Sequence, residues 1–168
     1  VESLAMSVKD NGDVYFVPAF SGLFSPHWDE SARGVLVGLT RFSNKFHIAR
    51  AVLESVAYQS FELLKSMEKD TGTVFDSVKV DGGMVDNNLL MQFQSDIFNK
   101  KVITQEINEI TAMGAGAASY LYLNELPLEN MNEYITQSST WNPNMDANQR
   151  THYISKWNKA ISKAKQWI

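Results

Sequence analysis

VFDSVKVDGGMVDNNLLMQFQSDIF, residues 74–98, carries a strand, a glycine turn and a helix in direct succession. The strand is predicted over Val74–Val80, because polar and apolar residues alternate at its end. Gly82 and Gly83 break it, and a helix is predicted from about Asn87 to Phe98. A strand that passes through a short loop into a helix is the building unit of α/β sheets.

The segments on either side extend this α/β order. Strands are predicted over Val14–Val17, Gly34–Leu39 and Val102–Ile103, and helices from Ser43 or Asn44 to about Gly72, over Thr111–Leu123 and over Ala147–Ile168. The strand at Gly34 is apolar at every position, so we expect it to be buried. The loop over residues 18–33 carries aromatic side chains that look exposed, and residues 129–148 are polar and weakly patterned.

The later strands must be parallel, because each is separated from the next by a crossover helix. Ligands of parallel sheets bind beyond the carboxyl ends of the strands. This rule directs attention to the loop that follows Val80.

Composition removes several classes of protein. The 168 residues are 44% hydrophobic and carry a formal net charge of −4, which indicates one globular domain without the basic footprint of a nucleic-acid binder. No cysteine is present, so disulfides and thiolate chemistry are excluded. We find no signal peptide and no membrane span, and expect a cytoplasmic protein. The chain opens on Val1 rather than Met, so we expect it to be a piece of a longer protein.

The loop Asp81–Asn88 is the candidate site. Two glycines let a ligand approach the backbone, the N–H groups that begin the helix favour phosphate or another anion, and Asn87 can cap the helix or offer its amide to a nucleotide. The loop is neither a Walker A sequence nor a Gly-x-Gly-x-x-Gly fingerprint. An ordinary Gly-Gly turn with a helix cap is the equal alternative.

Other polar residues favour structural roles. Arg50 and Glu54 are expected to form an exposed pair one helical turn apart, and His47 to lie at the surface or its boundary. The three histidines lack metal-ligand spacing, and no metal site is predicted. Gly114 and Gly116, in the helix over Thr111–Leu123, indicate close approach to a neighbouring element. The tryptophans and tyrosine of the last helix are interpreted as core rather than as a cofactor site.

Several motifs together resemble the FGGY carbohydrate kinases of the actin-like ATPase superfamily. The stretch over residues 34–54 fits that family's second signature: a glycine-bounded strand, a seven-residue spacer, then His47-Ile-Ala-Arg50 and Leu53-Glu54. The members that phosphorylate glycerol are the more similar ones, on Pro18-Ala-Phe-Ser-Gly-Leu23, Val80-Asp-Gly-Gly83, residues 87–97 and Thr111-Ala-Met-Gly-Ala115. The resemblance runs from about Val14 to Trp167.

The resemblance implies an RNase H-like, actin-like ATPase domain, with a mixed, mostly parallel sheet and helices on both faces. It makes residues 1–168 the C-terminal, nucleotide-binding domain of an enzyme whose N-terminal domain is missing. Gly83 and Asn87 would contact ATP or ADP, with Gly82 and Met84 on the adenosine side. The catalytic base, the glycerol-binding side chains and the phosphate loop match nothing here, so no catalytic residue is assigned.

The implied reaction is transfer of the γ-phosphoryl group of ATP to glycerol. Mg²⁺ would be held mainly through the phosphates and the missing domain, and a homodimer or homotetramer is expected. Two alternatives stay open: another FGGY kinase, such as one acting on a pentulose, and a non-enzymatic nucleotide-binding module of the actin-like kind.

Overall fold

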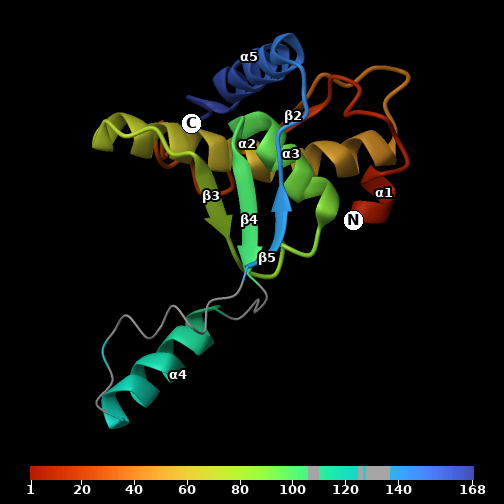
Figure 1. Cartoon of the computed structure of the whole chain (residues 1–168). Helices are drawn as coiled ribbons and strands as arrows, with labels where there is room; N and C mark the ends of the chain where they lie inside the picture. The colour runs from red at the N-terminus through yellow and green to blue at the C-terminus, as the bar shows by residue number, and fades with distance from the viewer. Residues whose placement is uncertain (106–109, 125–126, 128–136) are drawn as a thin grey trace.

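The computed structural model describes residues 1–105, 110–124, 127 and 137–168. Residues 129–136 of the polar segment 129–148 therefore lie outside the described residues. The elements follow in the order α1 (Glu2–Ala5), β1 (Tyr15–Val17), β2 (Val35–Val37), α2 (Lys45–Thr71), β3 (Ser77–Val80), α3 (Asn88–Phe98), β4 (Lys101–Gln105), α4 (Ile110–Leu123), β5 (Gln137–Trp141) and α5 (Ala147–Ala164). The predicted α/β order is confirmed (Figure 1).

The long helix α2 begins and ends where its sequence predicts. The Asn44 side chain accepts hydrogen bonds from the backbone N–H groups of Phe46 and His47, and His47 Nδ1 accepts from the Asn44 N–H in return. Gly72 ends the helix with a φ of +66°, a left-handed conformation that glycine adopts without strain. Local capping chemistry therefore fixes both ends of the element that spans the molecule.

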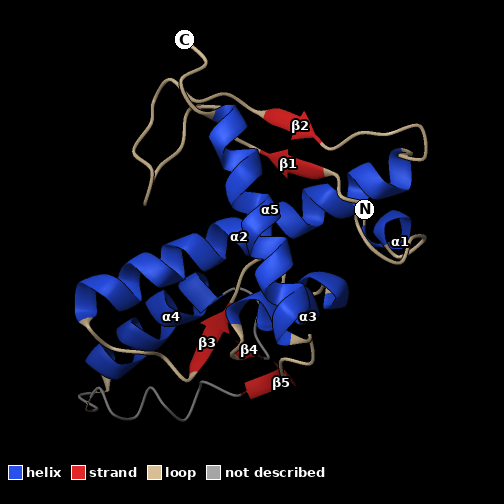
Figure 2. Cartoon of the chain, turned by 90° about the horizontal axis from the view of Figure 1, so that it is seen from above, coloured by secondary structure: helices blue, strands red, loops and turns tan. Residues whose placement is uncertain are grey.

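Two sheets flank this helix. β1 and β2 form an antiparallel pair, while β3, β4 and β5 form a mixed sheet in which β3 and β4 are parallel and β5 is antiparallel to β4. Figure 2 shows α2 between the β1–β2 pair and the three-stranded sheet. α3 packs directly on β4 and β5, and α2 packs on α3.

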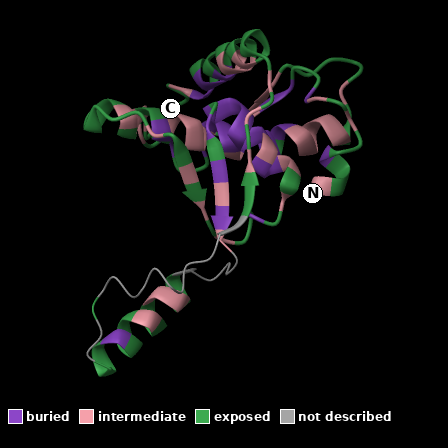
Figure 3. Cartoon of the chain, viewed as in Figure 1, coloured by how far each residue is buried: buried purple, intermediate pink, exposed green. Residues whose placement is uncertain are grey.

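The core lies where α2, α3 and α5 meet. Trp157 is 1% exposed and stacks on Tyr58 with 4.9 Å between ring centroids, and Phe93 meets the Tyr58 ring edge-on at 5.5 Å. The purple centre of Figure 3 marks this cluster. The aromatic residues of the last helix are thus core, as its pattern predicts, except that α5 ends at Ala164 and leaves Trp167 63% exposed.

The structure departs from the sequence analysis at three places. β2 is half-buried rather than buried, because within the described chain it pairs only with β1. The polar segment contains a strand, β5, which sequence pattern did not predict because strand β4 supplies its hydrogen bonds. Among the described residues, Gly114 and Gly116 approach no neighbour, since a Cβ at either would meet nothing there within 4 Å. α4 extends beyond the carboxyl ends of β3 and β4 (Figures 1 and 3).

Candidate functional site

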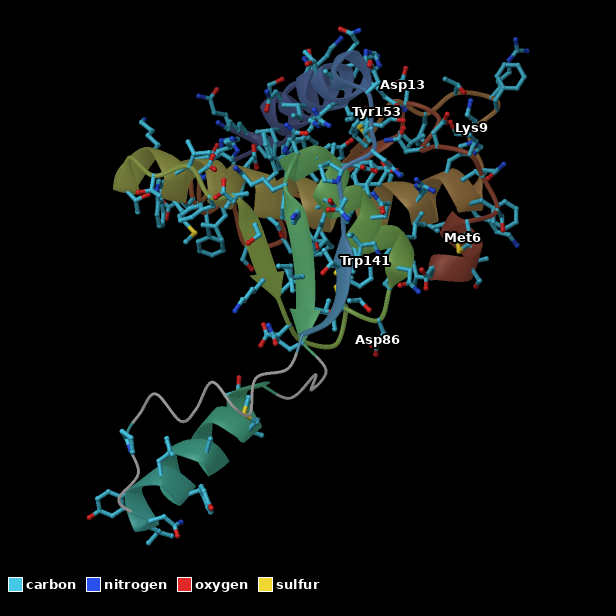
Figure 4. The ribbon with its side chains drawn as sticks, viewed as in Figure 1. Met6, Lys9, Asp13, Asp86, Trp141 and Tyr153 are labelled. Atoms are coloured by element: carbon cyan, nitrogen blue, oxygen red, sulfur yellow. The ribbon has the colours of Figure 1, made fainter. Side chains whose placement is uncertain are left out.

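The loop 81–87 lies where the topology rule places a ligand site, beyond the carboxyl end of β3 and before α3. It is built from two tight turns: the Val85 N–H donates to the Gly82 carbonyl at 3.1 Å, and the Asn87 N–H donates to the Met84 carbonyl at 3.1 Å. Val85 is buried and anchors the loop. In Figure 4, Asp86 of this loop is labelled at the same edge of the sheet.

The glycines face open space. Gly82 has a φ of +94°, whereas the backbone of Gly83 is outside the left-handed region, and a Cβ at either residue would meet nothing within 4 Å. Met84 beside them is 46% exposed. Only Gly82 is therefore required by backbone conformation, and neither glycine is required by close packing within the described chain. This arrangement leaves room for a ligand against the backbone.

Asn87 caps α3 and leaves its amide nitrogen available. Its Oδ1 accepts a hydrogen bond from the Leu90 N–H at 2.9 Å and so caps α3. Within the described residues the Nδ2 group of Asn87 makes no hydrogen bond, so it remains a donor for a ligand. The cap and the candidate ligand contact use opposite ends of one amide.

Two of the amides that begin α3 are not free for a phosphate, contrary to expectation. The Leu89 N–H donates to Glu2 Oε1 at 2.9 Å, and the Leu90 N–H is taken by Asn87. A carboxylate at a helix N-terminus is stabilised by the helix dipole, and it would repel a second anion. A nucleotide on this loop is accordingly better placed with its nucleoside, rather than its phosphates, next to α3.

The pair Arg50–Glu54 is formed but is not exposed. Arg50 Nε donates to Glu54 Oε1 at 2.6 Å, Asn11 Nδ2 donates to Glu54 Oε2 at 2.9 Å, and Glu54 is only 3% exposed. Burial raises the pKa of the Glu54 carboxyl to about 7, against the lowering effect of Arg50 and Asn11. Sequence reasoning missed this buried carboxylate because Asn11, its second partner, lies 43 residues away.

Each histidine has its own neighbours. His27 Nε2 lies 2.8 Å from Glu62, His152 Nε2 lies 3.7 Å from Asp13, and His47 is half-buried at the start of α2. In the part of the chain that the structure describes, no group of three histidine or acidic side chains is arranged to hold a metal ion. Over the same residues, no helix is both long and apolar enough to cross a bilayer.

The candidate loop is open rather than enclosed. A groove of about 850 Å³ lies elsewhere, between β2 and α5, and its lining includes no residue of the loop. Small-molecule sites bury most of their ligand. A small-molecule site at this loop would therefore need a second wall.

Comparison with known proteins identifies the family. The model of the FGGY family of carbohydrate kinases, C-terminal domain, matches residues 2–120. The glycerol kinases of Rhizorhabdus wittichii and Azorhizobium caulinodans are each 50% identical to this chain, over 100% and 99% of it, and the chain covers 33% and 34% of their lengths. The chain thus spans about a third of these relatives.

Solved structures agree with this result. The structure of Plasmodium falciparum glycerol kinase with ADP matches 97% of this chain with a TM-score of 0.86 and 32% identity, and the match covers 33% of that protein. A xylulose kinase from Lactobacillus acidophilus matches 96% of the chain with a TM-score of 0.77 at 22% identity, covering 32% of that protein, a likeness in fold alone. The fold, the family model and the relatives lead to one conclusion: the chain belongs to the FGGY family of carbohydrate kinases.

Proposed function

We propose that this chain is the C-terminal domain of an ATP-dependent glycerol kinase, which converts ATP and glycerol into ADP and sn-glycerol 3-phosphate. The observation that carries the proposal is the 50% identity to proteins named glycerol kinase, maintained over the whole chain. The N-terminal domain of such a protein is its covalent partner.

The loop residues Gly82, Gly83, Met84 and Asn87 are the proposed nucleotide contacts. The open space over both glycines, the exposed Met84 and the available Nδ2 group of Asn87 fit the nucleoside half of ATP or ADP. Glu2 at the start of α3 keeps phosphates away from that helix. The similarity to a glycerol kinase solved with ADP supports a nucleotide as the ligand.

The two domains divide the chemistry between them. Phosphoryl transfer requires in-line positioning, charge neutralisation and a base for the acceptor hydroxyl. The described residues hold no acidic cluster for Mg²⁺, so we assign Mg²⁺ to the phosphates and the N-terminal domain, together with the base and the glycerol site. This chain contributes the grip on the nucleoside and one wall of a cleft that closes on the substrates.

Glycerol is favoured over a pentulose as acceptor. The relatives at 46–50% identity are named glycerol kinase, whereas the xylulose kinase structures match at 18–22%. A non-enzymatic actin-like module would bind nucleotide without transferring the phosphoryl group.

A homodimer or homotetramer in the cytoplasm remains part of the proposal, and light scattering on the complete protein tests the assembly.

An ADP-release assay on the complete reading frame tests the function. We expect release that depends on glycerol, with xylulose and ribulose as matched acceptor controls at background rates. ADP release that depends on a pentulose would show that the acceptor is that pentulose and not glycerol. ATP binding without any acceptor-dependent ADP release would favour the alternative of a non-enzymatic nucleotide-binding module.

The chain alone supplies a further prediction. Residues 1–168 lack the base, the acceptor site and the phosphate loop, so we expect no glycerol-dependent turnover and only weak ADP binding, because the second wall is absent. Calorimetry measures the binding. Turnover by the pure chain, or micromolar affinity, would contradict the domain assignment.

A further inference from the structure

A carboxylate from the beginning of the chain reaches the candidate loop. Glu2 Oε1 accepts a hydrogen bond from the Leu89 N–H at 2.9 Å, across 87 positions of sequence. Helix α1, which carries Glu2, packs against α2, and its Ala5 is fully buried. The packing of α1 therefore holds the Glu2 carboxylate in place.

This contact fixes the first turn of α3. The first amides of a helix have no partner within the helix. Here the Leu89 amide is satisfied by Glu2 and the Leu90 amide by Asn87. Because a negative charge at this end of a helix is favourable, the two contacts together keep the turn from fraying. Asn87, which makes the second contact, is also a proposed nucleotide ligand.

We infer that Glu2 is a positioning residue for the nucleotide loop, which it holds in its binding conformation through the Leu89 amide without touching the nucleotide. The inference rests on the proposed function of the loop. When the Glu2 carboxylate is removed, a smaller fraction of molecules keeps Asn87 and Gly83 in place. The apparent affinity for nucleotide falls by that fraction.

The positioning role of Glu2 differs from direct contact with the nucleotide and from a contribution to the stability of the fold alone. A loop-positioning residue changes the Kd for ADP and the KM for ATP, and leaves kcat and the KM for glycerol unchanged once nucleotide is bound. A glutamine at position 2 retains an oxygen that accepts the Leu89 hydrogen bond. The conservative variant should therefore recover most of the affinity.

The test uses the complete protein with Glu2→Ala, Glu2→Gln and, as a control, Asp70→Ala, which removes an exposed carboxylate near the end of α2. Calorimetry measures the Kd for ADP, and amide hydrogen exchange measures protection of residues 88–90. We expect Glu2→Ala to weaken ADP binding roughly three- to tenfold, the effect of one hydrogen bond, with faster exchange at Leu89. Glu2→Gln and Asp70→Ala should stay within about twofold of the wild type.

An unchanged Kd in Glu2→Ala, with only a lower melting temperature, would overturn the inference and leave Glu2 a structural residue. Gly83→Val separates this failure from failure of the proposed function. If Gly83→Val weakens ADP binding while Glu2→Ala does not, the loop binds nucleotide and Glu2 does not position it. If wild-type protein binds no ADP, both the function and the inference are wrong.

Discussion

Gly83→Val in the complete protein separates a nucleotide site from an ordinary turn. A Cβ at Gly83 meets nothing within 4 Å, and its backbone is outside the left-handed region. A Cβ at this position thus introduces neither a clash with the described residues nor left-handed backbone strain. For valine we expect the free energy of unfolding to change by no more than about 0.5 kcal/mol. If the nucleotide lies against this backbone, the isopropyl group occupies the ligand's place, and ADP affinity should fall at least about tenfold, or ~1.4 kcal/mol.

Gly82→Ala is the matched control. Gly82 has a φ of +94°, so alanine there is strained whatever the free space, at roughly 1–3 kcal/mol. This variant reports what backbone strain alone does to the melting temperature. The assay pairs the melting temperature with the Kd for ADP. If Gly83→Val also loses several degrees and keeps a wild-type Kd, the two glycines make only a turn and the assignment of the site is refuted.

Three further predictions concern stability. Glu68 contacts Lys100 Nζ at 2.8 Å, and the hydrogen bond to Lys100 lowers the pKa of the Glu68 carboxyl to about 2. The free energy of unfolding should therefore fall as the pH drops from about 4.5 toward 2. Glu68→Gln should flatten that decline in urea titrations. Burial raises the pKa of Glu54 from its ordinary value of 4.5 to about 7, so the free energy of unfolding should fall as the pH rises through that window. If the melting temperature of Glu54→Gln changed between pH 5 and 7.5 with the same slope as that of the wild type, this prediction would be contradicted. Trp157→Ala should lose about 3–5 kcal/mol of unfolding free energy in denaturant titration, because Trp157 is buried against Tyr58.

Elements whose causes are local could be predicted from the sequence. The Asn44 cap, the Gly72 stop and the Gly-Gly break after Val80 depend on residues a few positions apart, and all three lie where expected. The parallel pairing of β3 and β4 followed from their connection by a helix. β5 was missed because its polar sequence becomes a strand only beside β4.

The candidate site was predictable in position but not in electrostatics. The position of the loop, its glycines and Asn87 followed from the strand–helix order, and Met84 from the family resemblance alone. The occupied N-terminus of α3, in contrast, depends on Glu2, 87 residues away. The burial of Glu54 likewise depends on Asn11 and on packing between distant segments. Sequence spacing does not reveal such long-range contacts. From spacing alone, the pair Arg50–Glu54 was therefore expected at the surface, although Glu54 is buried.

A crystal structure of the complete protein with ADP tests most directly whether the loop 81–87 binds the nucleotide. We predict the adenosine moiety in van der Waals contact with the backbone of Gly82 and Gly83, with the Asn87 Nδ2 group donating to it and the Glu2–Leu89 hydrogen bond retained. ADP bound at a site that includes none of these residues would contradict the account.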